Sequence, residues 1–206
     1  MEEKERDKLL GIKTVGIREW VNNNHYNRYE ATPYKALDVL FENYKFIDIN
    51  RVVDFGCGRG RVSFYLHNRF NLPVIGIEAN NKTYEEALEN KISYGLKTKH
   101  TTAPVEFKCS LAQHYKIDKK DNCFYFFNPF SVHIFRKVVD NILHSAEKDC
   151  RKLDLILYYP TREYEEFLEN STPFKIVDEI RIPGEIDKRE KFIIYRLREE
   201  FLYKDI

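Results

Sequence analysis

The chain has 206 residues, of which 43% are hydrophobic and 15% aromatic. This is enough apolar mass for one sizeable core but leaves little for a second full domain. Thirty-four Lys and Arg against 33 Asp and Glu leave a formal charge of +1, which excludes a strong global field toward nucleic acid or anionic membranes, although a local patch stays possible.

The charged start, MEEKERDKLL, lacks the apolar region of a secretory signal. No stretch approaches the roughly 20 apolar residues of a membrane-spanning helix. The four cysteines are widely spaced, without a C-x-x-C pair or a matching histidine cluster, so we expect no metal site. Three of them lie in or beside apolar runs, which favours buried thiols. Together these features predict a cytoplasmic protein.

Residues 1–49 differ from the rest and predict an N-terminal helical extension that acts as a lid. A polar, tyrosine-rich loop leads into a helix whose inner face carries Leu37, Leu40 and Phe41. Thr32 is the expected N-cap of this helix, and Pro33 suits its first position.

Residues 50–206 alternate short apolar runs with helical patterns. Strands are expected at 51–55, 73–78, 105–109, 122–127 and 153–159, with helices between them. The helix after 73–78 should begin at an Asn80 or Asn81 cap and bury a face that includes Ala87, Lys91 and Ile92.

The final elements are a helix capped by Thr161 and two strands, 174–182 and 191–197, which predict a hairpin. The alternation predicts an α/β domain with a mostly parallel sheet, helices on both faces and one antiparallel strand.

The stretch VVDFGCGRG (52–60) places Gly56, Gly58 and Gly60 directly after a buried strand. In a parallel sheet this turn lies where ligands bind, and bare backbone lets a ligand approach closely, while Gly60 lets the next helix pack on the sheet. Glycine turns also occur in plain loops. Glu78 ends the next strand, where a carboxylate can accept both hydroxyls of a ribose, or else cap the following helix. The combination predicts a nucleoside-containing cofactor.

Asp54 and the glycine spacing favour one kind of cofactor. The dinucleotide fingerprint is G-x-G-x-x-G, whereas this chain has G-C-G-R-G, one residue short before the third glycine. Asp54 would repel a pyrophosphate but attract an ammonium or sulfonium group. The sequence therefore favours a cationic cofactor over NAD(P).

VVDFGCGRG with Glu78 resembles motif I and the acidic motif II of class I S-adenosylmethionine-dependent methyltransferases, over about residues 50–200. The resemblance implies a Rossmann-like seven-stranded sheet in the order 3-2-1-4-5-7-6 with an antiparallel seventh strand. It implies S-adenosyl-L-methionine as cofactor, with Asp54, Gly56 and Gly58 beside the methionine part, Glu78 at the ribose, and Ala79 and Asn80 beside the adenine. Cys57 and Gly60, in the same turn, complete the expected cofactor-binding residues.

One departure concerns the turn after the third strand. Many members place an aspartate there for the adenine amino group, whereas this chain reads CSLAQ, so Ser110 or Gln113 would have to substitute.

FFNPFS (126–131) resembles a shortened (N/D)-P-P-(Y/F) motif of methyltransferases that act on amide or exocyclic nitrogens. The resemblance implies that Asn128 and the Pro129 carbonyl orient a target nitrogen while Phe130 stacks on the substrate. The alternative is a strand-to-helix turn in which Pro129 fixes φ and Phe130 packs in the core.

NPF, YYP (158–160) and YEATPY (29–34) also resemble a group of poorly characterised bacterial methyltransferases, which implies that Tyr29 and Thr32 lie over the cofactor. His25 and His133 are candidate general bases, although a lone histidine near a helix start is more often structural. Tyr158 or Tyr159 could line the target pocket, while the other faces a covering helix.

The expected activity is methyl transfer to a nitrogen on a protein or small molecule. Three alternatives stay open: an RNA base methyltransferase, for which KTKH (97–100) is the local basic cluster, an NAD(P)-dependent Rossmann oxidoreductase, and a nucleoside-binding module without catalysis.

Overall fold

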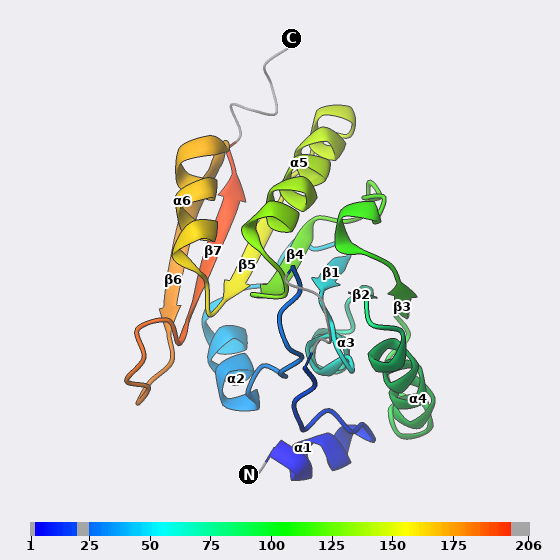
Figure 1. Ribbon diagram of the computed structural model, residues 1–206. Coiled ribbons are helices and arrows are strands. Elements are labelled where there is room, and N and C mark those ends of the chain that lie inside the picture. Colours follow the sequence, from blue (N-terminus) through cyan, green and yellow to red (C-terminus); the bar gives the residue numbers. More distant parts are fainter. Residues whose placement is uncertain (1–2, 20–24, 199–206) are drawn as a thin grey trace.

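Seven strands form one sheet in the order β3-β2-β1-β4-β5-β7-β6, with helices on both faces (Figure 1). The computed structural model describes residues 3–19 and 25–198. The strands are β1 (Val52–Phe55), β2 (Val74–Glu78), β3 (Val105–Cys109), β4 (Cys123–Phe127), β5 (Asp154–Tyr158), β6 (Phe174–Arg181) and β7 (Lys191–Leu197).

The first five strands pair in parallel, and β7 is antiparallel to both β5 and β6. The predicted order, the predicted fold class and the predicted terminal hairpin are thus confirmed, and the strand bounds fall within one residue of those expected.

The helices divide between two apolar clusters because successive strand residues point to opposite faces. Val52 faces a cluster that includes Leu37 and Val62, and Val53 faces one that includes Val138 and Leu168. The helices on the first side are α1 (Glu3–Leu10), α2 (Tyr34–Asn43), α3 (Arg61–Phe70) and α4 (Asn81–Lys97). Those on the second are the short η1 (Ala112–His114), α5 (Val132–Lys148) and α6 (Arg162–Ser171).

The predicted cap of α2 is wrong. The helix begins at Tyr34, and Pro33 occupies the cap position with an extended ψ of 139° and no side-chain cap. Thr32 is buried, and its hydroxyl lies 2.9 Å from the hydroxyl of Tyr125 on β4. The hydroxyl turns inward because the buried phenol needs a partner.

The helix α1 was not predicted, since its charged sequence has no apolar stripe. It is anchored by buried Asp7, whose carboxylate accepts hydrogen bonds from the backbone N–H of Thr14 and the hydroxyls of Thr14 and Tyr34. Buried Arg61, directly after the glycine turn, donates to Thr14 and forms ion pairs with Glu3 and Asp7. The segment from Glu3 to Thr14 is therefore tied to the start of α3.

The predicted inner face of α4 is partly wrong. Asn80 is its cap and Ala87 is buried, as expected, but Ile92 is 70% exposed. The buried stripe runs through Thr83, Ala87, Asn90 and Tyr94. It is rotated because the N-terminal segment covers it: the Asn90 carboxamide accepts from the N–H of Lys13 and donates to the carbonyls of Lys13 and Arg59.

Cys57 and Cys123 are buried, as expected, whereas Cys109, at the end of the edge strand β3, and Cys150, in the loop between α5 and β5, are exposed. Over residues 3–19 and 25–198, no helix is both long and apolar enough to cross a bilayer.

Candidate functional site

The candidate site lies where the carboxyl ends of β1, β2 and β4 meet. Asp54 pairs in register with Gly76 on β2 and Tyr125 on β4, and Glu78 is the last residue of β2. The turn from β1 into α3 therefore has a carboxylate on each of two neighbouring strands, at the edge of the sheet where α/β proteins bind ligands.

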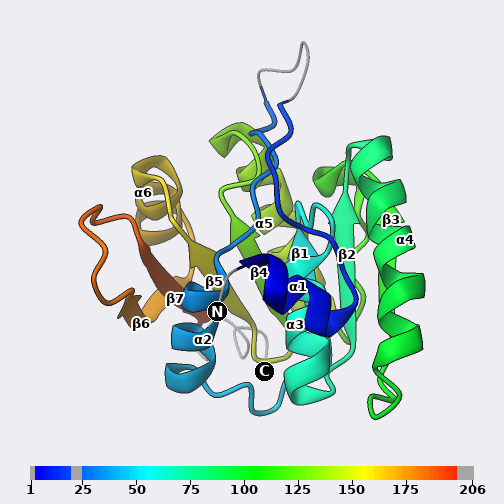
Figure 2. The same ribbon diagram turned by 90° about the horizontal axis from the view of Figure 1, so that it is seen from below.

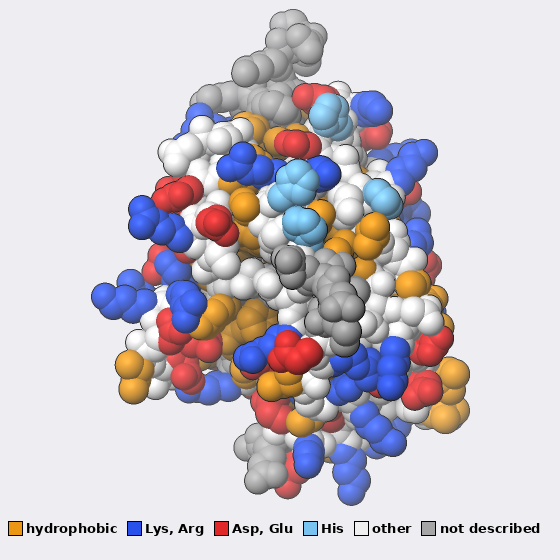
Figure 3. All heavy atoms as spheres, in the orientation of Figure 1, with side chains coloured by type: hydrophobic (Ala, Val, Ile, Leu, Met, Phe, Trp, Pro, Cys, Tyr) orange, Lys and Arg blue, Asp and Glu red, His pale blue; other side chains and the backbone are white. Residues whose placement is uncertain are grey.

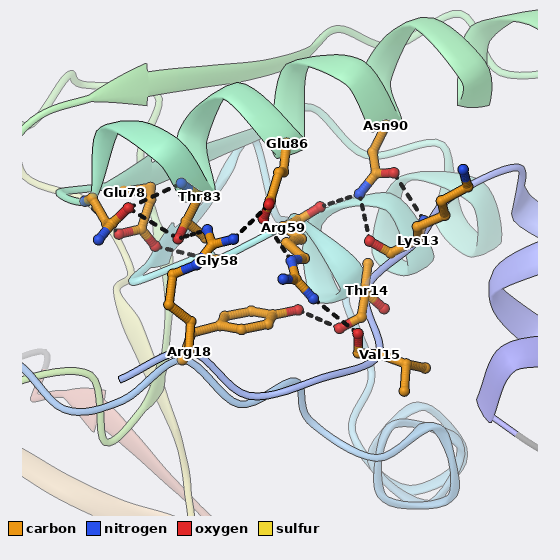
Figure 4. A network of polar contacts seen from close by, with 12 residues as sticks. Lys13, Thr14, Val15, Arg18, Gly58, Arg59, Glu78, Thr83, Glu86 and Asn90 are labelled. Atoms are coloured by element: carbon orange, nitrogen blue, oxygen red, sulfur yellow. Dashed lines mark hydrogen bonds and ion pairs between the residues drawn. The ribbon is translucent and has the colours of Figure 1, made fainter. Parts of the chain in front are cut away.

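Glu78 ties the glycine turn to β2. One carboxylate oxygen accepts the backbone N–H of Gly58 at 2.9 Å (Figure 4). The other accepts the backbone N–H of Asn80 at 2.7 Å. The side chain is buried, and burial is the main reason that the pKa of Glu78 lies above its ordinary value, while the two N–H groups act in the opposite direction. Each oxygen has a second lone pair, so hydroxyls of a ligand can still be accepted.

Asp54 is fully enclosed at the end of β1. Its carboxylate accepts the Ser63 hydroxyl at 2.7 Å, and burial, with a smaller contribution from the Glu78 charge, raises the pKa of Asp54 to about 7. Such a carboxylate favours a cationic neighbour, because a positive charge would offset the cost of ionising it away from water.

The three glycines meet different neighbours. Gly58 has φ of +56°, and a Cβ there would lie 2.1 Å from the ring of Tyr29. A Cβ at Gly56 would meet Pro129 at 2.4 Å, and one at Gly60 would meet the rings of Phe64 and Phe107. Gly60 therefore lets α3 pack on the sheet, as predicted. At Gly58 the close approach in this structure is made by the ring of Tyr29.

Two arms of the N-terminal segment, residues 13–19 and 25–30, cover the turn side by side (Figure 2). They pair through Arg18 and Tyr29, whose backbone groups exchange hydrogen bonds of 2.8 and 3.2 Å. We call this two-armed segment the cover. The Tyr29 hydroxyl donates to the Thr14 carbonyl at 2.5 Å, which holds its ring against the turn.

Arg18, Glu86 and Arg59 fasten the cover to α4 and to the turn (Figure 4). Glu86 on α4 accepts from Arg18 at 2.5 Å and from Arg59 at 2.7 Å, and Arg18 also donates to Thr83. Arg59, inside the glycine turn, donates to the Val15 carbonyl and lies 4.9 Å from the Tyr29 ring centre. These residues were not predicted, and their only sequence signal is the charge of Arg59 within the motif.

Two small chambers lie beneath the cover. The β2 chamber, of about 50 Å³, is lined by Glu78, Ala79, Asn80 and Ser110 on the sheet side. Tyr26 and its neighbours 27–30 line the opposite side.

The β1 chamber, of about 20 Å³, is lined by Asp54, Cys57, Tyr29 and Thr32. Gly56 lines both chambers, so they adjoin at the glycine turn. The predicted cofactor residues therefore line these two adjoining chambers, with two exceptions. Gly58 lies under the ring of Tyr29, and Gly60 lies against the rings of Phe64 and Phe107.

The outer cleft is much larger, at about 620 Å³. It opens beside residues 128–130, which we call the NPF loop. Asn128 and Tyr159 line it, whereas Pro129 and Phe130 line the β2 chamber. Phe127 and Glu30 line both chambers and the outer cleft, so the three spaces meet at these two residues.

The NPF loop is held by the cover. Asn27 donates its side-chain N–H to the carbonyl and carboxamide oxygens of Asn128, and its backbone N–H to the Pro129 carbonyl. Asn128 has φ of +38°, which presents its side chain to the outer cleft. Phe130 is 1% exposed and packs edge-on against Phe126 and Tyr26, so its ring serves the core instead of offering a free face to a substrate.

The remaining candidates have the following partners. Ser110 donates to the Leu111 carbonyl, and Gln113 accepts from Tyr26. The His25 ring contacts the Ser131 hydroxyl and lies 6.1 Å from the His133 ring. Tyr158 is buried, whereas Tyr159, which follows the last residue of β5 with φ of +50°, lines the outer cleft.

Acidic and basic side chains are interspersed on the face seen in Figure 3, without a continuous basic surface there. Within the described ranges, no three His, Cys, Asp or Glu side chains are placed to hold a metal ion.

No family model and no curated protein matches this sequence. Solved structures do match. A putative RNA methyltransferase from Pyrococcus horikoshii is 20% identical, with 95% of this chain and 97% of that chain covered and a TM-score of 0.54. An S-adenosylmethionine-dependent methyltransferase from Methanosarcina mazei is 17% identical, with 76% and 96% covered and a TM-score of 0.59.

An RNA methyltransferase from Salinibacter ruber, solved with S-adenosyl-L-homocysteine, is 16% identical, with 81% and 92% covered and a TM-score of 0.55. These similarities show that the chain has the class I methyltransferase fold, which confirms the predicted resemblance at the level of the fold. The narrower resemblance to the bacterial group with NPF stays a prediction.

Proposed function

We propose that this protein is an S-adenosylmethionine-dependent methyltransferase that transfers a methyl group to a nitrogen. The observation that carries the proposal is the pair of buried carboxylates, Asp54 and Glu78, at the ends of adjacent strands on either side of a glycine turn. The shared fold of the solved methyltransferases supports it.

The donor set fits the parts of this cofactor. Glu78 has lone pairs left for ribose hydroxyls, and Ala79, Asn80 and Ser110 line the same β2 chamber, where an adenine would lie. Asp54 has the Ser63 hydroxyl as its partner and forms no ion pair within the described ranges, so a cationic amino group of the ligand suits it. When bound, the cofactor supplies a sulfonium methyl group.

The small size of both chambers implies that the cover moves to admit the cofactor. The residues that would have to move are Tyr29, whose ring lies on Gly58, and Arg18, whose contacts bridge the cover to α4. We retain residues 1–49 as the lid of a methyltransferase domain that comprises residues 50–206.

Asn128 is the residue that we assign to the acceptor. Its carboxamide lines the outer cleft directly after β4 and next to Phe127, where the spaces meet. An amide oxygen at that point can accept a hydrogen bond from a target nitrogen and align its lone pair with the methyl group. The ring that can stack on the acceptor is that of Phe127, which lines the outer cleft, because the ring of Phe130 is buried.

RNA is the second candidate acceptor, because the Pyrococcus and Salinibacter structures carry RNA methyltransferase names. The near-neutral charge of this chain, +1 overall, favours a small or peptidic acceptor instead.

A thermal-shift comparison tests the cofactor. We expect S-adenosylhomocysteine to raise the melting temperature and NADH at the same concentration to leave it unchanged, since a ligand that binds only the native state stabilises it. The reverse pattern would assign the site to a dinucleotide.

A further inference from the structure

The outer cleft meets both inner chambers at Phe127 and Glu30. A ligand group in the β1 or β2 chamber and a second molecule in the outer cleft would therefore meet beside these two side chains. At about 620 Å³ the cleft has the size of a small-molecule site. The side chains that line the cleft therefore indicate which chemical class of acceptor it can bind.

The charges that line the cleft are mainly negative. Glu19, Glu30 and Glu190 contribute three carboxylates to the lining, and Arg28, 3.1 Å from Glu30 and about half exposed, contributes one cation. Arg189 lies over the ring of Tyr159, but its charge is paired with Asp187 at 2.8 Å. This balance disfavours a phosphate backbone and favours an acceptor with positive charge.

Aromatic faces complete the lining. Tyr159 is held with φ of +50°, and its hydroxyl donates to Asp187 at 2.7 Å. The Arg189 guanidinium lies 4.6 Å from the centre of the Tyr159 ring, so this ring already attracts a cation within the chain. Phe127 lies across the ring edge of Tyr159, with centroids 6.4 Å apart. Rings and carboxylates together form the environment that alkyl ammonium groups prefer.

We propose that the outer cleft binds the methyl acceptor as an alkyl ammonium group, held by Glu30 and Glu190 against the rings of Phe127 and Tyr159. The inference rests on the proposed function and adds the acceptor class to it. Glu30, at the junction of the three spaces, is the residue that sets specificity for a positive charge.

The transfer step balances as follows. The bound ammonium first loses one proton to water at the open side of the cleft. The freed nitrogen lone pair then forms the N–CH₃ bond while the C–S bond of the sulfonium breaks, and its electron pair stays on sulfur as a neutral thioether. The product is a methylated ammonium, and no oxidant, reductant or metal takes part.

The experiment incubates the full chain with tritiated-methyl S-adenosylmethionine and one of four probes: cadaverine, a lysine-rich peptide, a glutamine-rich peptide or a single-stranded RNA. We expect label in cadaverine, the lysine-rich peptide or both. Cadaverine would identify a free amine and the peptide a protein side chain, and either result supports the proposal. Label in RNA or in the glutamine-rich peptide alone would overturn it.

Binding provides a readout that does not depend on turnover. With S-adenosylhomocysteine saturating, we expect Glu30→Gln and Glu190→Gln each to weaken the calorimetric affinity for the amine that accepts label at least tenfold. Glu190 lines the outer cleft and neither inner chamber, so Glu190→Gln should leave the cofactor affinity unchanged. Glu163→Gln, on the exposed side of α6, is the matched control and should leave both affinities unchanged. Amine binding that is equal in all four proteins would refute the assignment of Glu30 and Glu190. If wild-type protein binds no S-adenosylhomocysteine, the proposed function fails; if it binds this ligand but no amine, only the present inference fails.

Discussion

The backbone N–H of Gly58 donates to the Glu78 carboxylate across 2.9 Å, so the turn after β1 is fixed to the tip of β2. The same carboxylate accepts the N–H of Asn80 at the start of α4. One buried side chain thus positions both the bare turn and the helix terminus that surround the proposed cofactor site.

Replacing Glu78 with glutamine should weaken S-adenosylhomocysteine binding by at least tenfold. The amide keeps the shape but turns one of the two acceptor oxygens into a donor, and hydrogen bonds to charged groups contribute about 1.5–3 kcal/mol each. Calorimetric titration measures the loss. Glu89→Gln, on the exposed side of α4, is the control, and equal affinity in both variants would show that Glu78 only ties the backbone together.

Asp54 predicts a pH dependence of cofactor binding. Burial raises the pKa of Asp54 to about 7, and a cationic ligand binds the ionised form. Affinity for S-adenosylmethionine should therefore fall by about tenfold for each pH unit below 7 and level off above it. Asp54→Asn should bind weakly at every pH, and its affinity profile should lack the step near pH 7. A wild-type profile that also lacks this step would contradict the assignment.

The same group has the opposite effect on the stability of the unliganded protein. Because the folded pKa of Asp54 lies above its unfolded value, the folded state binds more protons, and the free energy of unfolding decreases as pH rises from about 4 to 7. Urea unfolding across this range measures the free energy of unfolding of wild type and of Asp54→Asn. The two free energies should be most similar near pH 4, and the wild type should become less stable relative to the variant as pH rises toward 7.

Gly58→Ala should destabilise the protein by about 2–4 kcal/mol. A Cβ would lie 2.1 Å from the Tyr29 ring at φ of +56°, which combines overpacking with a left-handed backbone. Adding Tyr29→Ala should recover the overpacking part, so the two changes are expected to be non-additive in a double-mutant cycle. Gly95→Ala is the control, because nothing lies within 4 Å and helical glycine is unfavourable; it should stabilise by about 0.5–1 kcal/mol. Strict additivity of the first pair would contradict the described contact.

Asn128→Gly should leave S-adenosylhomocysteine affinity unchanged and lower kcat by roughly 100-fold, the size of effect expected when the reacting groups lose alignment. We choose glycine instead of alanine because glycine adopts the positive φ of 38° at this position without backbone strain, so the variant removes the side chain alone. Single-turnover measurements with the labelled acceptor separate this loss from product release. Normal turnover in the variant would mean that the NPF loop is structural.

Much of the fold could be predicted because its signals are local. Short runs of β-branched and aromatic residues predict the strands. The three glycines after β1 and Glu78 at the end of β2 indicate the edge of the sheet where the strands end. The helix α1 could not be predicted in this way. It is held by contacts of buried Asp7 with Thr14 and Tyr34, which lie outside the helix, and the sequence of the helix itself does not indicate these partners. Thr32 was misassigned for a related reason: a buried phenol on β4, far along the chain, claims its hydroxyl.

Side-chain direction was the harder part of the site. FFNPFS indicated a reactive loop, but not that Phe130 turns into the core while Phe127 lies at the junction of the three spaces. Nor does the sequence indicate that Arg18 and Glu86, 68 positions apart, fasten the cover. Such pairs depend on the path that the loop takes across the surface, and the hydrophobic periodicity of the sequence does not predict that path.

Calorimetric titration of the wild-type chain with S-adenosylhomocysteine at pH 8 is the most direct test of the central claim. We predict one saturable site per chain, whose heat is lost or strongly reduced in both Asp54→Asn and Glu78→Gln. A wild-type protein that is folded and yet releases no heat with this ligand would contradict the claim.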